Sequence, residues 1–129
     1  MPRAQALIID DKPTNILVLQ QLLTLEGIIS FAIPTAKNLH LQLDAFRNID
    51  IIFLDLELPH VNGYQAAELI RSHPNVSRAK LVAYSVHASE LNNVYETGFD
   101  GFLGKPINAE FFPDQLARLL RGERIFYTP

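Results

Sequence analysis

The sequence contains no cysteine, and this absence removes several classes of function. Without thiols there can be no disulfide framework, no thiolate metal site and no cysteine nucleophile. Charged residues make up only 19% of the chain, and its 11 Lys and Arg against 14 Asp and Glu give a net charge of −3. No block of basic residues occurs, so a surface that holds nucleic acid through its phosphates is disfavoured.

Long apolar segments are also lacking. No apolar run approaches the roughly 20 residues that span a bilayer, and residues 1–5 lead directly into a strand-like run without the apolar region of a signal peptide. We therefore expect a soluble cytoplasmic protein without a membrane partner. Its 129 residues, 48% of them apolar, match one domain with one core. The expected domain covers residues 1–129, with a core over 5–122 and a C-terminal tail over 123–129.

Short apolar runs alternate with segments of helical spacing. Several runs are nearly continuous in apolar or β-branched residues, as in strands that helices cover on both faces. The expected strands are 6–9, 28–32, 49–54, 81–84 and 101–103, and the expected helices are 13–27, 39–46, 63–73, 91–98 and 112–122. This alternation predicts an α/β fold with (βα)5 order, a doubly wound parallel sheet of five strands.

Chemically active side chains follow the ends of four of these strands. They are Asp10 and Asp11, Asp55 with Glu57, Ser85, and Lys105. Any one of them alone is more often a turn or capping residue, or a solvated charge. Ligands of open parallel sheets bind beyond the carboxyl ends of the strands, so their joint placement favours a binding site.

The acidic residues at this edge predict a cation. Clustered carboxylates raise one another's pKa unless a cation neutralises them. Oxygen ligands favour Mg²⁺ or Mn²⁺, whereas zinc is disfavoured without cysteine or a close histidine pair. Because Mg²⁺ usually shares its ligand shell with phosphate, a phosphoryl ligand is predicted, with Lys105 and Ser85 as its further partners. Asp55 is the candidate nucleophile, since carboxylates form aspartyl-phosphates.

Four segments taken together carry a family resemblance. They are residues 7–15 (LIIDDKPTN), 52–63 (IFLDLELPHVNG), 82–85 (VAYS) and 98–106 (GFDGFLGKP). Each is a weak signal alone, but their order and spacing are specific. Over residues 5 to 122 the chain resembles the receiver domains of response regulators in two-component signalling, and more closely the single-domain, chemotaxis-regulator-like ones. This resemblance implies a flavodoxin-like receiver fold.

The resemblance also implies roles for the acidic residues. Asp55 would be the phospho-acceptor. Asp11 would bind Mg²⁺ directly, Asp10 mainly through water, and Glu57 through its backbone carbonyl.

Further roles implied by the resemblance concern the switch. Lys105 would contact the phosphoryl group, and the Lys105–Pro106 bond would be cis. The Ser85 hydroxyl would turn toward the phosphoryl group, and the aromatic ring of Phe102 would then rotate inward. The surface made by the fourth helix, the fifth strand and the fifth helix would change shape as a result.

Two side chains and the tail each allow two interpretations. Glu57 and His87 occupy positions that tune dephosphorylation in the family, or both are exposed and inert. The apolar tail residues 125–127 either fold back on the last helix or form part of a homodimer or partner interface.

The leading interpretation is a receiver that accepts phosphate from a sensor histidine kinase or a histidine phosphotransfer protein and docks to a downstream target protein. Such a protein is not an enzyme beyond its own phosphoryl transfer and autodephosphorylation. A competing interpretation is a small Mg²⁺-dependent phosphohydrolase with an aspartyl nucleophile, resembling haloacid-dehalogenase-type phosphatases. In those, however, the nucleophile follows the first strand, the acidic pair comes late, and a cap domain holds the substrate.

Two more functions are compatible with the same fold. A receiver-like module could bind partners without phosphorylation, although intact Asp11, Asp55, Ser85 and Lys105 argue against it. A flavin-binding relative of flavodoxin is disfavoured because the loop after the first strand is acidic where an FMN phosphate needs bare N–H groups.

Overall fold

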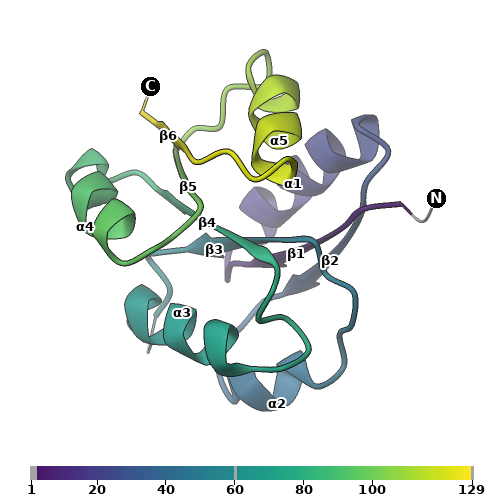
Figure 1. Cartoon of the computed structure of the whole chain (residues 1–129), viewed down its shortest axis with the longest axis vertical. Helices are drawn as coiled ribbons and strands as arrows, with labels where there is room; N and C mark the ends of the chain where they lie inside the picture. Colours follow the sequence, from purple (N-terminus) through teal and green to yellow (C-terminus); the bar gives the residue numbers. More distant parts are fainter. Residues whose placement is uncertain (1–2, 60, 129) are drawn as a thin grey trace.

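The computed structural model describes residues 3–59 and 61–128, and one parallel sheet runs through it (Figure 1). Its strands are β1 (Gln5–Ile9), β2 (Ile29–Ile33), β3 (Ile51–Asp55), β4 (Lys80–Ser85), β5 (Gly101–Gly104) and β6 (Ile125–Tyr127). Their order across the sheet is β2-β1-β3-β4-β5-β6. The doubly wound α/β prediction is confirmed, but the predicted count of five strands was one too few.

Five α-helices and one 3-10 turn connect the strands. They are α1 (Pro13–Leu25), α2 (Leu39–Leu43), α3 (Gly63–Ser72), the 3-10 turn η1 (Ala88–Glu90), α4 (Leu91–Glu96) and α5 (Phe112–Leu120). Pro13 suits the first turn of α1, where its missing N–H has no intrahelical acceptor. The Asn62 side chain caps α3 by accepting the Tyr64 N–H at 2.8 Å. None of the helices in residues 3–59 and 61–128 is long and apolar enough to span a membrane.

Alternating strand residues feed two separate cores, one on each face of the sheet. Leu7 and Ile9 of β1 pack with residues of α2 and α3. Ala6 and Ile8 point the other way and pack with residues of α1 and α5, the two helices drawn on the upper side of the sheet in Figure 1. Both faces are therefore apolar, which explains why the strand sequences do not alternate with polar residues.

The sixth strand comes from the C-terminal tail. Gly122, with φ +94°, follows the end of α5, and residues 125–127 then pair in parallel with β5. Gly101 permits this close approach, because a Cβ there would lie 2.9 Å from the carbonyl oxygen of Ile125. The tail was expected to fold back on the last helix or to form an interface. It does fold back, since Ile125 packs in one cluster with Leu116 and Leu119 of α5, and its pairing with β5, which was not predicted, extends the sheet. β6 lies beyond the last helix, outside the strand–helix alternation that indicates the other strands, so the sequence pattern shows only an apolar tail there.

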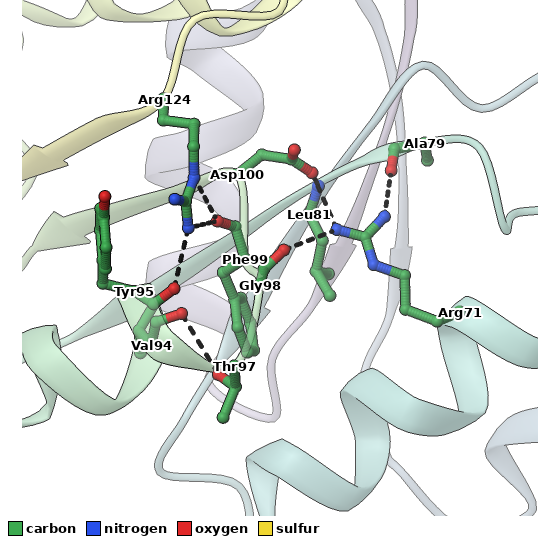
Figure 2. A network of polar contacts seen from close by, with 10 residues as sticks. All are labelled: Arg71, Ala79, Leu81, Val94, Tyr95, Thr97, Gly98, Phe99, Asp100 and Arg124. Atoms are coloured by element: carbon green, nitrogen blue, oxygen red, sulfur yellow. Dashed lines mark hydrogen bonds and ion pairs between the residues drawn. The ribbon is translucent and has the colours of Figure 1, made fainter.

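Arg124 anchors this strand to the neighbouring helix (Figure 2). Its guanidinium donates to the carbonyl oxygens of Tyr95 (2.9 Å) and Phe99 (2.8 Å). It also lies over the rings of Tyr95 and Phe126, at 4.2 and 5.0 Å from their centroids. The C-terminal strand is thus fixed to both the end of α4 and the edge of β5.

Candidate functional site

The strand order places the acidic residues at one point of the sheet edge. β1 and β3 are neighbours, and strand order reverses between them, so Asp10 and Asp11 lie beside Asp55. One carboxylate oxygen from each of the three lies within 4.8 Å of the others. Asp10 and Asp55 are fully buried, and Asp11 is partly exposed. The predicted convergence of these carboxylates is what the structure shows.

Asp10 has hydrogen bonds on both carboxylate oxygens. Oδ1 accepts the N–H of Lys12 at 2.9 Å, and Oδ2 accepts the hydroxyl of Tyr84. Burial alone would raise the pKa of Asp10, but these bonds and the positive charge of Lys105 outweigh it and lower the pKa below its usual value. Asp10 is thus held as an anion, and each of its carboxylate oxygens accepts one hydrogen bond.

Asp55 is in a different environment. Its Oδ1 accepts the N–H of Glu57 at 2.9 Å and the Lys105 ammonium at 3.1 Å, while Oδ2 is buried and has no hydrogen-bond partner. Burial raises the pKa of Asp55 to about 6, and the nearby Asp10 charge adds to the rise, although the two donors on Oδ1 oppose it. The free oxygen of Asp55 is therefore an unsatisfied acceptor in a carboxylate-rich site.

The donor set fits a small hard cation. Three buried carboxylate oxygens lack a hydrogen bond within the described residues, one each on Asp11, Asp55 and Glu57. Buried anionic oxygens without donors are costly unless a cation neutralises them. Oxygen-only ligation of this kind suits Mg²⁺, and the orphan oxygens of Asp11 and Asp55 belong to the acidic cluster itself.

Lys105 reaches the site from the end of β5. Its ammonium contacts Asp55 and lies 4.6 Å from the centroid of the Tyr84 ring. Its backbone N–H donates to the carbonyl oxygen of Ser85 at 2.8 Å, and its bond to Pro106 is cis. The positive charge thus lies against the acceptor carboxylate.

Ser85 and Glu57 also meet at this edge. The Ser85 hydroxyl donates to Oε1 of Glu57 at 3.0 Å, and the Val86 N–H donates to the same oxygen at 2.9 Å. His87 is exposed, and its backbone N–H donates to the Ser85 hydroxyl oxygen at 2.9 Å. The Glu57 side chain is therefore hydrogen-bonded to Ser85 and Val86, whereas His87 contacts Ser85 only through its backbone N–H.

Phe102 lies apart from these groups in the middle of β5. It is fully buried on the α2 and α3 side of the sheet, and it stands opposite Phe126 of β6. The ring is therefore already inward, beside the C-terminal strand.

Tyr84 was not predicted as a site residue. It precedes Ser85 in β4, and the apolar run around it indicates only a buried strand. Neighbouring strand residues point to opposite faces, so its hydroxyl reaches Asp10 from the face that α1 and α5 cover. Its position at a strand end next to the acidic pair was the one available signal.

The geometry agrees with the comparisons to known proteins. The profile of the family described as "Response regulator receiver domain" matches residues 6–117. The chain belongs to the response regulator receiver domain family.

Curated relatives carry this receiver domain within much longer chains. Hybrid signal transduction histidine kinase A of Dictyostelium discoideum is 34% identical over 122 residues, which cover 90% of this chain and 6% of that protein. Sensor protein GacS of Pseudomonas syringae pv. syringae is 34% identical over 112 residues, which cover 81% of this chain and 12% of that protein. The matched segment thus spans 6% and 12% of the length of these two relatives.

Solved structures show the same fold. A CheY-like receiver domain from Methylobacillus flagellatus has a TM-score of 0.79 and 27% identity, covering 92% of this chain and 99% of that one. The receiver domain of a sensor histidine kinase from Pseudomonas aeruginosa PAO1, solved with a magnesium ion coordinated in its active site cleft, has a TM-score of 0.75 and 24% identity, covering 93% of this chain and 99% of that one.

Family membership gives the function of the chain in outline. It is a phospho-accepting receiver of two-component phosphorelay signalling, and receivers of this family bind Mg²⁺ at their acidic site. They pair with histidine kinases or phosphotransfer proteins, and they generally act in signalling rather than as enzymes.

Proposed function

We propose that Asp55 is the residue that accepts the phosphoryl group, from a sensor histidine kinase or a histidine phosphotransfer protein. The observation that carries this proposal is the asymmetry of its carboxylate: Oδ1 is bound by Lys105 and the Glu57 N–H, while the buried Oδ2 is free. A free carboxylate oxygen beside a fixed lysine is suited to nucleophilic attack.

The chain's residues would divide the transfer between them. Oδ2 of Asp55 attacks phosphorus, the bond between phosphorus and the donor's histidine nitrogen breaks, and that nitrogen retains the electron pair and is protonated by solvent. The ammonium of Lys105 then holds one phosphoryl oxygen and the hydroxyl of Ser85 another.

The acidic residues would hold Mg²⁺, with Mn²⁺ as an alternative. Asp11 and Asp55 each have an oxygen without a hydrogen bond, which is free for a direct contact with the cation. Both oxygens of Asp10 already accept a hydrogen bond, and Asp10 would bind the cation mainly through water. The Glu57 backbone carbonyl completes the protein's donor set. When bound, the cation supplies positive charge that stabilises the phosphoryl oxygens during transfer.

The proposal extends to the output. Ser85 and Phe102 would form the switch, with the buried Phe102 ring of this structure as its inward position. The surface of α4, β5 and α5 would be read by a downstream target protein or by a second copy in a homodimer. Glu57 and His87, two residues beyond Asp55 and Ser85, would set the rate at which water removes the phosphoryl group. Residues 1–129 would act as one receiver domain, in the cytoplasm, with no reaction other than its own phosphorylation and autodephosphorylation.

A phosphorylation assay tests the proposal. Incubation with Mg²⁺ and acetyl phosphate should add about 80 Da to the protein. The Asp55→Asn variant should show no adduct, whereas Asp114→Asn, on the exposed face of α5, should react like the wild type.

Three results would contradict it. An unreactive wild type would favour a module that works without phosphorylation, and an equally reactive Asp55→Asn would place the acceptor elsewhere. Sustained turnover of a generic phosphate ester would indicate a phosphohydrolase.

A further inference from the structure

The Glu57 side chain makes a contact that the proposed transfer does not use. One oxygen, Oε1, accepts both the Ser85 hydroxyl and the Val86 N–H, at 3.0 and 2.9 Å. Its second oxygen, Oε2, is buried without a partner. A hydroxyl and a backbone N–H that converge on one anionic oxygen form a small oxyanion site, and in this structure a carboxylate of the chain itself fills it.

These donors lie next to the acceptor carboxylate. Glu57 directly contacts Asp55, because its backbone N–H donates to Oδ1. Lys105 binds the same oxygen, and its own N–H donates to the carbonyl oxygen of Ser85. A phosphoryl group on Asp55 would therefore find lysine on one side, and on the other a hydroxyl and an N–H that are already occupied.

We propose that the Glu57 carboxylate is an internal competitor of the phosphoryl group, which occupies the Ser85 hydroxyl and the Val86 N–H until a phosphoryl oxygen displaces it. The inference rests on the proposed function of Asp55. It makes Glu57 a positioning residue that acts through Ser85 and Val86: it holds their loop close to Asp55 before phosphorylation and weakens the binding of a phosphoryl oxygen there.

The displaced side chain has room to move. Glu57 is partly exposed, and it lines a cavity of about 180 Å³ together with Asn62, Tyr64 and His87. Exchange of one anionic acceptor for another leaves neither donor unsatisfied.

Three substitutions of Glu57 separate competition for the donors from simple repulsion between charges. Glu57→Ala removes the acceptor and its charge. Glu57→Asp keeps the charge but is one methylene too short to reach the donors. Glu57→Gln keeps the length and an acceptor oxygen but is neutral. All three keep the backbone carbonyl.

The probe is beryllofluoride with Mg²⁺, a mimic of the phosphoryl group. Competition predicts that Glu57→Ala and Glu57→Asp bind it about 5- to 30-fold more tightly than the wild type, while Glu57→Gln stays closer to the wild type. Repulsion predicts the opposite grouping. Glu57→Gln should then bind beryllofluoride as tightly as Glu57→Ala, whereas Glu57→Asp should bind it with the affinity of the wild type. Mg²⁺ affinity measured without beryllofluoride should change less than beryllofluoride affinity.

The amide proton of Val86 reports the contact by NMR. In chelator it should resonate downfield in the wild type, because it is bonded to a carboxylate, and move upfield in Glu57→Ala and Glu57→Asp. Beryllofluoride should return it downfield in those variants. The Gln5 amide, which donates to the Asp50 carboxylate at 2.8 Å at the start of β1, serves as the unaffected control.

The outcomes separate the two proposals. A wild type that does not bind beryllofluoride contradicts the proposed function of Asp55. A wild type that binds it, with Glu57→Ala and Glu57→Asp within twofold or with an unmoved Val86 amide, overturns the competition. The grouping expected from repulsion, or gains matched by equal gains in Mg²⁺ affinity, overturns it as well.

Discussion

At the residue scale, two neighbouring buried aspartates have opposite protonation preferences. The Tyr84 hydroxyl and the Lys12 N–H stabilise the anion of Asp10, whereas the free oxygen of Asp55 leaves its anion poorly stabilised. The Tyr84 phenol is the largest of the contributions that lower the pKa of Asp10, while burial is the main cause that raises the pKa of Asp55, so Asp10 carries its charge more readily when no cation is bound.

Substitution of this phenol tests its importance. Tyr84→Phe removes the donor and leaves a buried anionic oxygen without a partner, so the free energy of unfolding at pH 7 should fall by about 1.5–3 kcal/mol. Urea denaturation in chelator measures the change. The exposed Tyr95→Phe is the matched control and should change stability by less than about 0.5 kcal/mol. Equal effects of the two substitutions would show that the bond to Asp10 contributes nothing.

The sequence allowed most of the site to be predicted because its residues lie at strand ends. Parallel topology alone puts Asp10, Asp11 and Asp55 at the same edge of the sheet, and the adjacency of β1 and β3, which the sequence does not show, brings them together. The bond of Tyr84 to Asp10 and the contact of Glu57 with Ser85 depend on side-chain rotamers, which no spacing in the sequence encodes.

At the scale of elements, β6 is held by a few specific contacts. Its three residues pair with β5, and the rings of Phe126 and Tyr127 pack edge-on against Tyr95 and Phe111. Arg124 adds the bonds to the end of α4 that Figure 2 shows. Arg71 of α3 donates to the carbonyl oxygens of Ala79 and Gly98. It also forms an ion pair with Asp100. The two arginines therefore both bind the loop between α4 and β5, Arg71 from α3 and Arg124 from the segment before β6.

Loss of one arginine should loosen this strand. Arg124→Ala removes bonds to two carbonyl oxygens and the contacts with two rings, so the free energy of unfolding should fall by about 1–2 kcal/mol. Hydrogen exchange at residues 125–127 should rise more than in β1. Arg121→Ala, which breaks only an exposed pair with Glu123, should cost less than about 0.5 kcal/mol. Unchanged exchange in β6 would mean that backbone pairing alone holds the strand.

The contrast between β6 and the other strands explains what sequence patterns can predict. Strands β1, β3 and β4 are runs of four or more apolar residues that helices cover on both faces, and their pattern indicates them directly. β6 depends on the turn at Gly122, the missing side chain of Gly101 and the reach of Arg124. These are tertiary contacts, so the tail could be recognised as apolar but not placed.

At the scale of the whole molecule, the fold gathers negative charge at one edge of a sheet with two apolar faces. Three of its 14 acidic residues meet there, two of them fully buried. Stability is therefore linked to both pH and divalent cations through Asp55. Its pKa of about 6 in the folded protein exceeds its ordinary value of 3.8, so its contribution to stability is full below about pH 4 and is lost as pH rises through 6.

This linkage predicts a specific pH profile. In chelator, the free energy of unfolding of the wild type should fall relative to Asp55→Asn by up to about 3 kcal/mol between pH 4 and pH 7. At pH 7, Mg²⁺ at about 100 times its dissociation constant should restore about 2.7 kcal/mol to the wild type. It should restore less at pH 5, where Asp55 is protonated, and less to Asp55→Asn, which lacks a carboxylate ligand.

Urea titrations at each pH measure both effects. A difference in the free energy of unfolding between the two proteins that stays constant from pH 4 to pH 7 would show that burial does not raise the pKa of Asp55. Stabilisation by Mg²⁺ that is equal in both proteins would show that the Asp55 carboxylate is not a ligand of the cation.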